Sequence, residues 1–311
     1  MAVPESHAPQ SDGPGGLLPF GPIAYGCWRF GGTSTSEASV KVNTAIECGM
    51  TLIDTAAIYG YTGDVPAADE SSGFGAAESL LGRVLAESPG LRDQITLATK
   101  GGIFPPVPYD SSPTYLRASV DESLRRLQVD RIDLFQVHRP DLLVHPESLA
   151  AVLGELVAAG KVRAVGVSNY SVAQTRALTS YLEVPLVSTQ PEFSPLELAP
   201  LMDGTLDHAM QHGVVPLAWS PLGGGRLGLP PTNDERAEAV ARICDRIASE
   251  QGVTRTAVVL AWVMRHPAGC VPIVGTQRPE RIRECARAVE VILSRDEWYE
   301  ILVAGRGEPM P

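Results

Sequence analysis

Lysine is nearly absent from this sequence. Only Lys41, Lys100 and Lys161 occur among 311 residues, although the chain has 25 basic residues in total. Because a lysine can lose its proton near neutral pH and an arginine cannot, each lysine is a better candidate for chemistry than a typical basic residue of this chain. The 36 acidic residues give a formal charge of −11, and no basic run occurs. Nucleic acid and anionic membrane surfaces are therefore excluded as main partners.

Cysteine and long apolar runs are also scarce. The cysteines are odd in number, widely spaced and without a CxxC pair; they are Cys27, Cys48, Cys244, Cys270 and Cys285. This pattern predicts neither a disulfide framework nor a zinc site, so we expect no bound metal and a reducing, cytoplasmic location. No run of about 18 apolar residues is present, which excludes a membrane span.

The N-terminus lacks the features of a secretory signal. It begins MAVPESHAPQSDGPGG, with neither a basic segment nor an apolar core. We expect residues 1–18 to form a flexible polar tail and residues 19–311 to form a single domain.

Short apolar segments alternate with longer amphipathic ones along the rest of the chain. The predicted strands are 23–27, 51–54, 95–99, 132–137, 162–167, 187–190, 214–219 and 271–274. The predicted helices are 37–48, 76–87, 113–127, 146–159, 171–182, 199–212, 255–266 and 279–290. Apolar strands that each precede a helix are typical of parallel strands buried on both faces. A repeat of about 35–40 residues favours one α/β domain, a closed (β/α)8 TIM barrel. The alternative is an open doubly wound sheet, but no GxGxxG motif follows the first strand.

Polar residues collect where the predicted strands end. In a barrel of this kind the chemistry lies at the carboxyl ends of the strands. The residues at these ends are Asp54, Lys100, His138, Ser168, Asn169, Gln190, Trp219 and Ser220. A single polar residue at a strand end is usually a turn former, but six strands that end this way indicate a site.

Asp54, Tyr59, Lys100 and His138 could together reduce a carbonyl group. A hydride delivered to a carbonyl carbon leaves an alkoxide that must be protonated, and a tyrosine can serve as the acid if a cation lowers its pKa. We expect Lys100 to be that cation and Asp54 to be its ion-pair partner. His138 could donate to the carbonyl oxygen. The alternative is an inert ion pair at the barrel mouth, with Tyr59 an ordinary loop residue and His138 a packed one.

Six motifs resemble, in order, the successive signatures of the aldo-keto reductases. They are LIDTAAIYG, TLATKGG, LFQVHRPD, GKVRAVGVSNYS, AWSPLGGG and VPIVGTQRPERIRE, within residues 20–290. The resemblance implies a (β/α)8 barrel and an NAD(P)H-dependent carbonyl reductase. It places Asp54, Tyr59, Lys100 and His138 on the family's catalytic tetrad, with Tyr59 as the general acid.

The same resemblance implies the cofactor-binding residues. Ser168, Asn169 and Gln190 match positions that hold the nicotinamide carboxamide, and Trp219 matches the aromatic residue that stacks on the ring. The full predicted set is Gly26, Cys27, Trp28, Asp54, Ser168, Asn169, Gln190, Trp219, Ser220, Leu222, Gly223, Gly225, Arg226, Gly275, Thr276, Gln277, Arg281 and Glu284. Gly275 stands where many members have a basic residue, and Cys285 stands where many have asparagine. Arg278 or Arg281 could still bind a 2′-phosphate, so NADPH is favoured and use of NADH is possible.

Two acidic segments with aromatic residues suggest the substrate. Residues 60–76 hold Asp64, Asp69 and Glu70, and residues 101–112 hold Asp110, with no basic residue in either segment. A bulky carbonyl compound that carries an amine would suit such a rim. A solvated acidic loop without a role in binding is the alternative. The predicted pocket residues are Trp28, Phe30, Tyr61, Phe74, Phe104, Tyr109 and Phe193.

The sequence thus predicts an NADPH-dependent reductase of a small-molecule aldehyde or ketone. A second possibility is a cofactor-binding regulatory or redox-sensing protein on the same scaffold, against which the intact tetrad argues. A third is an alcohol or sugar dehydrogenase that runs in the oxidative direction, because the same residues serve both directions.

Overall fold

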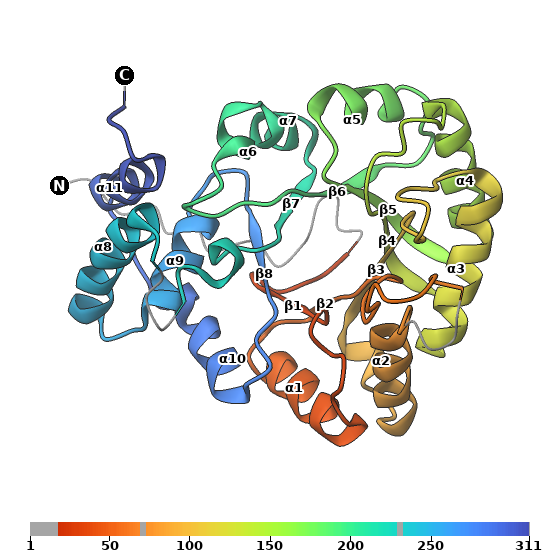
Figure 1. Cartoon of the computed structure of the whole chain (residues 1–311), viewed down its shortest axis with the longest axis horizontal. Coiled ribbons are helices and arrows are strands. Elements are labelled where there is room, and N and C mark those ends of the chain that lie inside the picture. The colour runs from red at the N-terminus through yellow and green to blue at the C-terminus, as the bar shows by residue number, and fades with distance from the viewer. Residues whose placement is uncertain (1–17, 69–72, 229–232, 311) are drawn as a thin grey trace.

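The computed structural model describes residues 18–68, 73–228 and 233–310, and the predicted tail lies almost wholly outside them. Within this part of the chain all paired strands are parallel and close into a barrel in sequence order (Figure 1). The strands are β1 (Ala24–Gly26), β2 (Leu52–Asp54), β3 (Thr96–Gly101), β4 (Ile132–Val137), β5 (Val162–Ser168), β6 (Leu186–Gln190), β7 (Val215–Ala218) and β8 (Val271–Val274). The predicted (β/α)8 barrel is confirmed, and each predicted strand overlaps an observed one.

Helices surround the barrel (Figure 1). They are α1 (Thr35–Glu47), α2 (Ala76–Glu87), α3 (Pro113–Leu127), α4 (Pro146–Ala158), α5 (Val172–Thr179), α6 (Ala199–Met202), α7 (Thr205–His212), α8 (Glu235–Gln251), α9 (Arg255–Met264), α10 (Pro279–Ala286) and α11 (Arg295–Arg306). The short 3-10 helices among the described residues are η3 (Arg92–Gln94), η4 (Gly223–Gly225) and η5 (Arg287–Glu290). None of the helices in the described part of the chain is long and apolar enough to cross a membrane.

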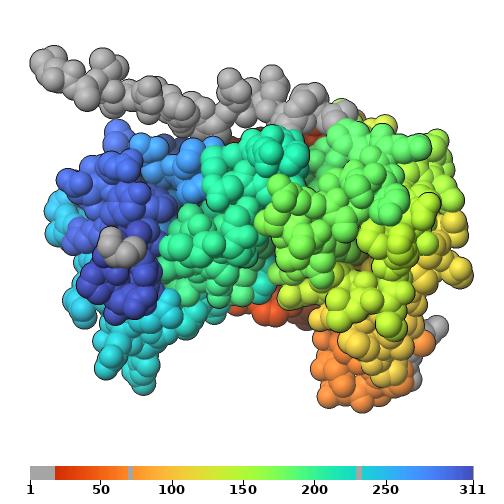
Figure 2. Space-filling view, turned by 90° about the horizontal axis from the view of Figure 1, so that it is seen from above, coloured from red at the N-terminus to blue at the C-terminus, as the bar shows by residue number. Residues whose placement is uncertain are grey.

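Three helical features differ from the prediction. Helices α8 and α11 were not predicted, although each carries a start signal, since Asp234 and Ser294 cap their first turns. The prediction assumed that one helix follows each strand. Helices α8 and α11 are additional to that pattern, so they were missed. The predicted helix 199–212 is two helices, because Gly204 adopts a left-handed conformation (φ 83°) between α6 and α7. Figure 2 shows α8 and α11 at the end of the molecule opposite α2.

The inside of the barrel is apolar at its amino-terminal half. Along each strand every second side chain points into the barrel. Leu18, the last residue of the predicted tail, packs onto this inner layer, so it belongs to the folded domain. The layer also contains Ala24, Leu52, Ala98, Leu134, Ala164, Val187, Leu217, Val271 and Ile273.

Candidate active site

A layer of polar side chains lies directly above the apolar layer inside the barrel. Asp54, Lys100 and Gln136 each stand two residues beyond an inward apolar residue of β2, β3 and β4. The strand alternation therefore points all three into the barrel. The pairing register places Lys100 next to Gln136 on neighbouring strands. The sequence thus assembles a polar cluster at the carboxyl end of the barrel, as expected for a (β/α)8 enzyme.

The centre of this cluster is a buried ion pair. The Lys100 ammonium lies 2.7 Å from Asp54 Oδ2 and also donates to the Thr55 carbonyl oxygen at 2.8 Å. The two charged side chains are 0% and 2% exposed. The other oxygen, Asp54 Oδ1, accepts from Gln190 Nε2 at 3.1 Å and from Gln136 Nε2 at 3.4 Å. Both charges are therefore compensated, which a buried pair requires.

Tyr59 and His138 lie on the cavity side of the ion pair. The Lys100 ammonium is 5.0 Å from the centre of the Tyr59 ring. The rings of Tyr59 and His138 meet edge-on with centroids 6.0 Å apart. Both residues line the main cavity, whereas Lys100 does not. The structure therefore brings all four predicted catalytic residues together, with Lys100 behind Tyr59.

Burial governs the protonation of these groups. Burial raises the pKa of Tyr59, although Lys100 acts in the opposite direction. The expected net lowering of this pKa is thus not observed, because the desolvation of a phenolate outweighs the nearby charge. Burial lowers the pKa of Lys100, but Asp54 and Tyr59 together raise it above its ordinary value. Burial and the charges of Lys100 and Arg139 hold the pKa of His138 well below its usual range. At neutral pH Tyr59 is a protonated phenol and His138 a neutral imidazole.

A cavity of about 810 Å³ extends from these residues to α10. Such a volume is within the range of small-molecule and cofactor sites. Most of the predicted cofactor residues line it, namely Gly26, Trp28, Asp54, Ser168, Asn169, Gln190, Trp219, Ser220, Leu222, Gly225, Gly275, Thr276, Gln277, Arg281 and Glu284. In the described residues no three histidine, cysteine, aspartate or glutamate side chains gather as a metal ion would require.

The wall beside the tetrad is a connected hydrogen-bond network. Trp219 Nε1 donates to Asn169 Oδ1 at 3.0 Å, and Asn169 Nδ2 donates to Ser168 Oγ at 2.8 Å. Ser168 in turn donates to the Gln190 carbonyl oxygen at 3.0 Å. These contacts hold amide and hydroxyl groups in fixed orientations next to an indole ring. Such a surface fits the carboxamide and the flat ring of a nicotinamide.

The far end of the cavity suits phosphate groups. Gly224 and Gly225 line it with positive φ values of 69° and 96°, and a Cβ on either residue would meet no other atom within 4 Å. A ligand can therefore approach the backbone closely here. Helix α10 begins at the same end, so the positive end of its dipole lies beside the cavity. Arg278 and Arg281 lie on the wall beside it.

Three predicted cofactor residues lie off the described cavity wall. Cys27 is fully buried in the core, and its N–H donates to the Asp54 carbonyl oxygen. Gly223 is buried, and a Cβ on it would lie 2.9 Å from Leu196 Cδ1. Arg226 points away to Asp234, with its Nη1 2.9 Å from the carboxylate. The sequence alone offered no sign of this ion pair.

The structure brings one of the predicted substrate-pocket residues, Trp28, to the described cavity wall. Trp28 lines the cavity and is 62% exposed. Phe30 and Phe193 are core residues at 1% and 0% exposure, and Phe193 packs on Trp262. The other four predicted residues are not part of the described wall. Phe74 stacks edge-on against Phe104, whose ring lies next to Tyr115; Tyr61 donates to the Val65 carbonyl oxygen, and Tyr109 is 40% exposed.

Some wall residues were not predicted. Those with hydroxyl or charged side chains are Arg29, Arg139, Thr254, Arg255 and Thr256. Arg139 directly follows His138, so its position in the site could have been inferred from the motif. Thr254, Arg255 and Thr256 stand at the start of α9, where Thr254 caps the helix and accepts from the Ala257 N–H. This helix start was the signal in the sequence that could have identified them.

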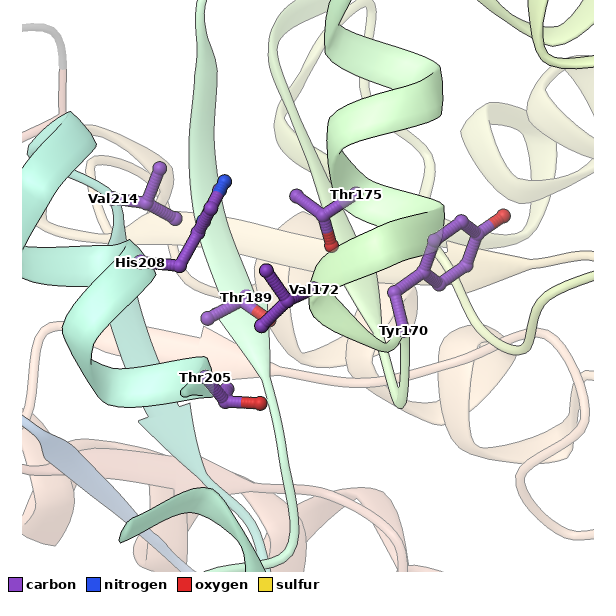
Figure 3. A pocket seen from close by; sticks show the side chains of 7 residues that line it. All are labelled: Tyr170, Val172, Thr175, Thr189, Thr205, His208 and Val214. Atoms are coloured by element: carbon purple, nitrogen blue, oxygen red, sulfur yellow. The ribbon is translucent and has the colours of Figure 1, made fainter. Parts of the chain in front are cut away.

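A second, much smaller cavity lies outside the barrel between α5, β6 and α7 (Figure 3). Its volume is about 10 Å³, roughly the space for one water molecule. It is lined by Tyr170, Val172, Thr175, Thr189, Thr205, His208 and Val214. It cannot hold a substrate, whereas the large cavity is lined by Asp54, Tyr59 and His138 and is the candidate active site.

Comparison with known sequences agrees with this geometry. The model of the Aldo/keto reductase family matches residues 22–303. A 6-dehydroglucose reductase from Novosphingobium aromaticivorans is 51% identical over 292 residues, which cover 93% of each chain. A second protein of that name, from Agrobacterium fabrum, is 38% identical over 299 residues, 92% of this chain and 94% of the relative.

Solved structures of aldo-keto reductases share the fold. A glycerol dehydrogenase from Gluconobacter oxydans superimposes with a TM-score of 0.81 at 27% identity, covering 94% of both chains. An aldo/keto reductase from Klebsiella pneumoniae, solved with NADP and acetate, gives a TM-score of 0.74 at 26% identity over 94% of this chain and 93% of that one. The chain therefore belongs to the aldo/keto reductase family and is an oxidoreductase.

Proposed function

We propose that this protein reduces the aldehyde group of an oxidised hexose, such as 6-dehydroglucose, to the alcohol with NADPH as reductant. The observation that carries the reductase chemistry is the buried Lys100–Asp54 ion pair behind Tyr59 and His138 in the cavity wall. The names of the relatives that are 51% and 38% identical support the sugar substrate. The Klebsiella structure with NADP supports the cofactor.

The tetrad would protonate the carbonyl oxygen. When bound, NADPH supplies a hydride to the carbonyl carbon. Neutral His138 donates an N–H hydrogen bond that orients the carbonyl oxygen, and Tyr59 transfers its hydroxyl proton to it. The phenolate that remains faces the Lys100 ammonium, which Asp54 holds in place. A proton from solvent then restores Tyr59.

The cavity offers groups for each part of the cofactor. Ser168, Asn169 and Gln190 would hold the carboxamide, with Trp219 against the ring. Backbone groups at Ser220, Leu222 and Gly225 would approach the pyrophosphate. The segment 275–284 and the start of α10 would hold the adenosine end.

The charge of the cavity wall favours a hydroxylated substrate over an amine. Among the described residues, the charged groups on the wall are Arg29, Arg139, Arg255, Arg278, Arg281, Asp54 and Glu284. Arg255 is paired with Asp245, and Arg278 and Arg281 lie at the end proposed for the adenosine. Arg29 and Arg139 are left to face a substrate, where they would repel an ammonium group and donate N–H hydrogen bonds to sugar hydroxyls. Asp69 and Glu70 of the predicted acidic rim lie outside the described residues.

Catalytic efficiency should be highest for a hexose aldehyde. We expect kcat/KM with NADPH to be at least about tenfold higher for 6-dehydroglucose than for glyceraldehyde or 4-nitrobenzaldehyde, because each well-placed hydroxyl contact contributes about 1 kcal/mol. Initial rates measured from NADPH absorbance test this. Equal efficiencies for all three aldehydes would contradict the sugar assignment and leave general carbonyl reduction in place.

A matched pair of amine-bearing and neutral aldehydes tests the rival substrate class. We expect no advantage for the amine at low salt. A preference for the amine that disappears at high ionic strength would instead favour an acidic rim, because exposed charges are screened over about 10 Å at 0.1 M salt.

Arg281→Ala should weaken use of NADPH more than use of NADH. Arg278 is paired with Glu280, whereas Arg281 lies on the cavity wall and forms no ion pair with the described residues, so its guanidinium is available for a 2′-phosphate. Loss of a charge-assisted contact is expected to raise KM for NADPH about tenfold. An equal effect on both cofactors would show that Arg281 binds the part that they share.

Oxidation of a sugar alcohol with NADP is the second candidate function. The name of the Gluconobacter neighbour, a glycerol dehydrogenase, favours it. The tetrad serves either direction, so rates measured both ways at neutral pH decide which one dominates.

A further inference from the structure

Lys41 is a buried lysine that the proposed chemistry does not use. It lies on α1, is 8% exposed, and is one of only three lysines among 25 basic residues. Burial of an ammonium group is costly unless partners compensate for the lost water. Its position therefore requires an explanation.

Lys41 connects the loops that follow β1 and β8. Its Nζ donates to Thr33 Oγ1 and to Gln277 Oε1, each at 3.1 Å. Both acceptors are neutral, and no carboxylate of the described residues lies within ion-pair distance. Glu37, one turn earlier on α1, is engaged with the Ser34 cap at 2.7 Å and 3.0 Å. The positive charge of Lys41 is thus not compensated by a direct ionic contact.

The lysine also fixes the cavity wall at Gln277. An ammonium group can only donate, so the Gln277 amide oxygen must face Lys41 and the amide nitrogen must face away. That nitrogen donates to the Gly275 carbonyl oxygen at 3.3 Å. The Tyr25 hydroxyl donates to the Thr276 carbonyl oxygen at 3.1 Å. Residues 275–277 all line the cavity, and Lys41 contacts Gln277 without lining the cavity itself.

We propose that Lys41 is a positioning residue that makes the site selective for a cofactor with a 2′-phosphate. It holds the loop 275–277 through Gln277, and its charge acts on the phosphate from behind the wall. A 2′-phosphate adds up to about two negative charges, and a buried cation is screened by salt far less than the exposed Arg278 and Arg281. The inference rests on the proposed function, because it takes the adenosine end of NADPH to lie against residues 275–284.

The test compares Lys41→Met, Lys41→Arg and Lys41→Gln by calorimetric titration with NADPH, NADH and 2′,5′-ADP. Lys161→Met is the matched control, since Lys161 is an exposed lysine paired with Asp121. Lys41→Met should weaken binding of NADPH and 2′,5′-ADP about five- to tenfold and that of NADH less than about twofold, the scale of one lost polar contact. Lys41→Arg should keep most of the selectivity, and Lys161→Met should keep all of it.

The outcomes separate the two proposals. If Lys41→Met loses affinity equally for NADPH and NADH, or for neither, the role of Lys41 is overturned. The proposed cofactor still stands in that case, provided that the wild-type protein binds NADPH more tightly than NADH. A wild type that binds NADH as tightly as NADPH would overturn both. If Lys41→Met does not fold, Lys41→Gln provides the test, because glutamine keeps a hydrogen-bond donor but has no charge. Lys41→Gln must then lose the preference for NADPH over NADH that Lys41→Arg retains.

Discussion

Replacement of Tyr59 with phenylalanine is expected to lower kcat for aldehyde reduction by at least about 10²-fold, the scale of a lost general acid. The substitution removes the hydroxyl proton and keeps the ring, so the edge-on contact with His138 persists. Because burial raises the pKa of Tyr59, the wild-type hydroxyl is protonated at neutral pH and can act as a donor. Steady-state rates with saturating NADPH measure the loss.

Tyr181→Phe is the matched control for Tyr59→Phe. Tyr181 is 46% exposed and meets His145 on the molecular surface, so its hydroxyl should not affect turnover. Binding of NADPH to the Tyr59 variant should stay within about twofold of wild type, because a phenyl ring still fills the site. Near-full turnover by Tyr59→Phe would show that another group supplies the proton.

The position of the tetrad could be predicted because it follows from strand geometry. Asp54 is the last residue of β2 and Lys100 the last but one of β3, and the alternation of side chains turns both into the barrel above Leu52 and Ala98. The order of the strands then makes β2 and β3 neighbours. Local sequence and the barrel rule together suffice for the ion pair.

Aromatic side chains near the site could not be placed in the same way. Phe30 and Phe193 follow β1 and β6 just as wall residues do, yet both turn into the core. In a loop no alternation rule states which way a side chain points. Phe193 is buried because Trp262, 69 residues later in the sequence, offers a packing partner. A contact of this kind depends on tertiary packing rather than on local pattern.

Long-range polar contacts were equally invisible in the sequence. The hydrogen bond from Lys41 to Gln277 joins residues 236 positions apart. Gln136 was never a candidate, although it is fully buried and hydrogen-bonded to Asp54. Gly166 leaves room for it, since a Cβ there would lie 3.1 Å from the Gln136 side chain and 2.1 Å from Ser188 Oγ. Such partners become evident only when the barrel closes.

Lys100→Met is expected to lower kcat by at least about 10²-fold, and Lys100→Arg should not restore it. Methionine keeps most of the volume but removes the charge that stabilises the Tyr59 phenolate. Arginine keeps a charge, but its planar group cannot occupy the 0% exposed site where the ammonium contacts Asp54 and the Thr55 carbonyl. Single-turnover rates with bound NADPH measure the chemical step directly. A fully active Lys100→Arg enzyme would refute a specific role for the ammonium.

The loss in Lys100→Met must be distinguished from simple misfolding. Removal of one partner leaves the Asp54 carboxylate buried and unpaired, which is expected to cost about 3–5 kcal/mol of stability. The double variant Asp54→Asn with Lys100→Met removes both charges. In the wild-type protein Gln190 donates to Asp54 at 3.1 Å, and the amide oxygen of an asparagine at this position can still accept that hydrogen bond. Urea unfolding should therefore show most of the stability restored in the double variant, while its kcat stays at the level of Lys100→Met. Recovery of activity together with stability would instead mean that the ion pair only supports the fold and that Tyr59 needs no cation behind it.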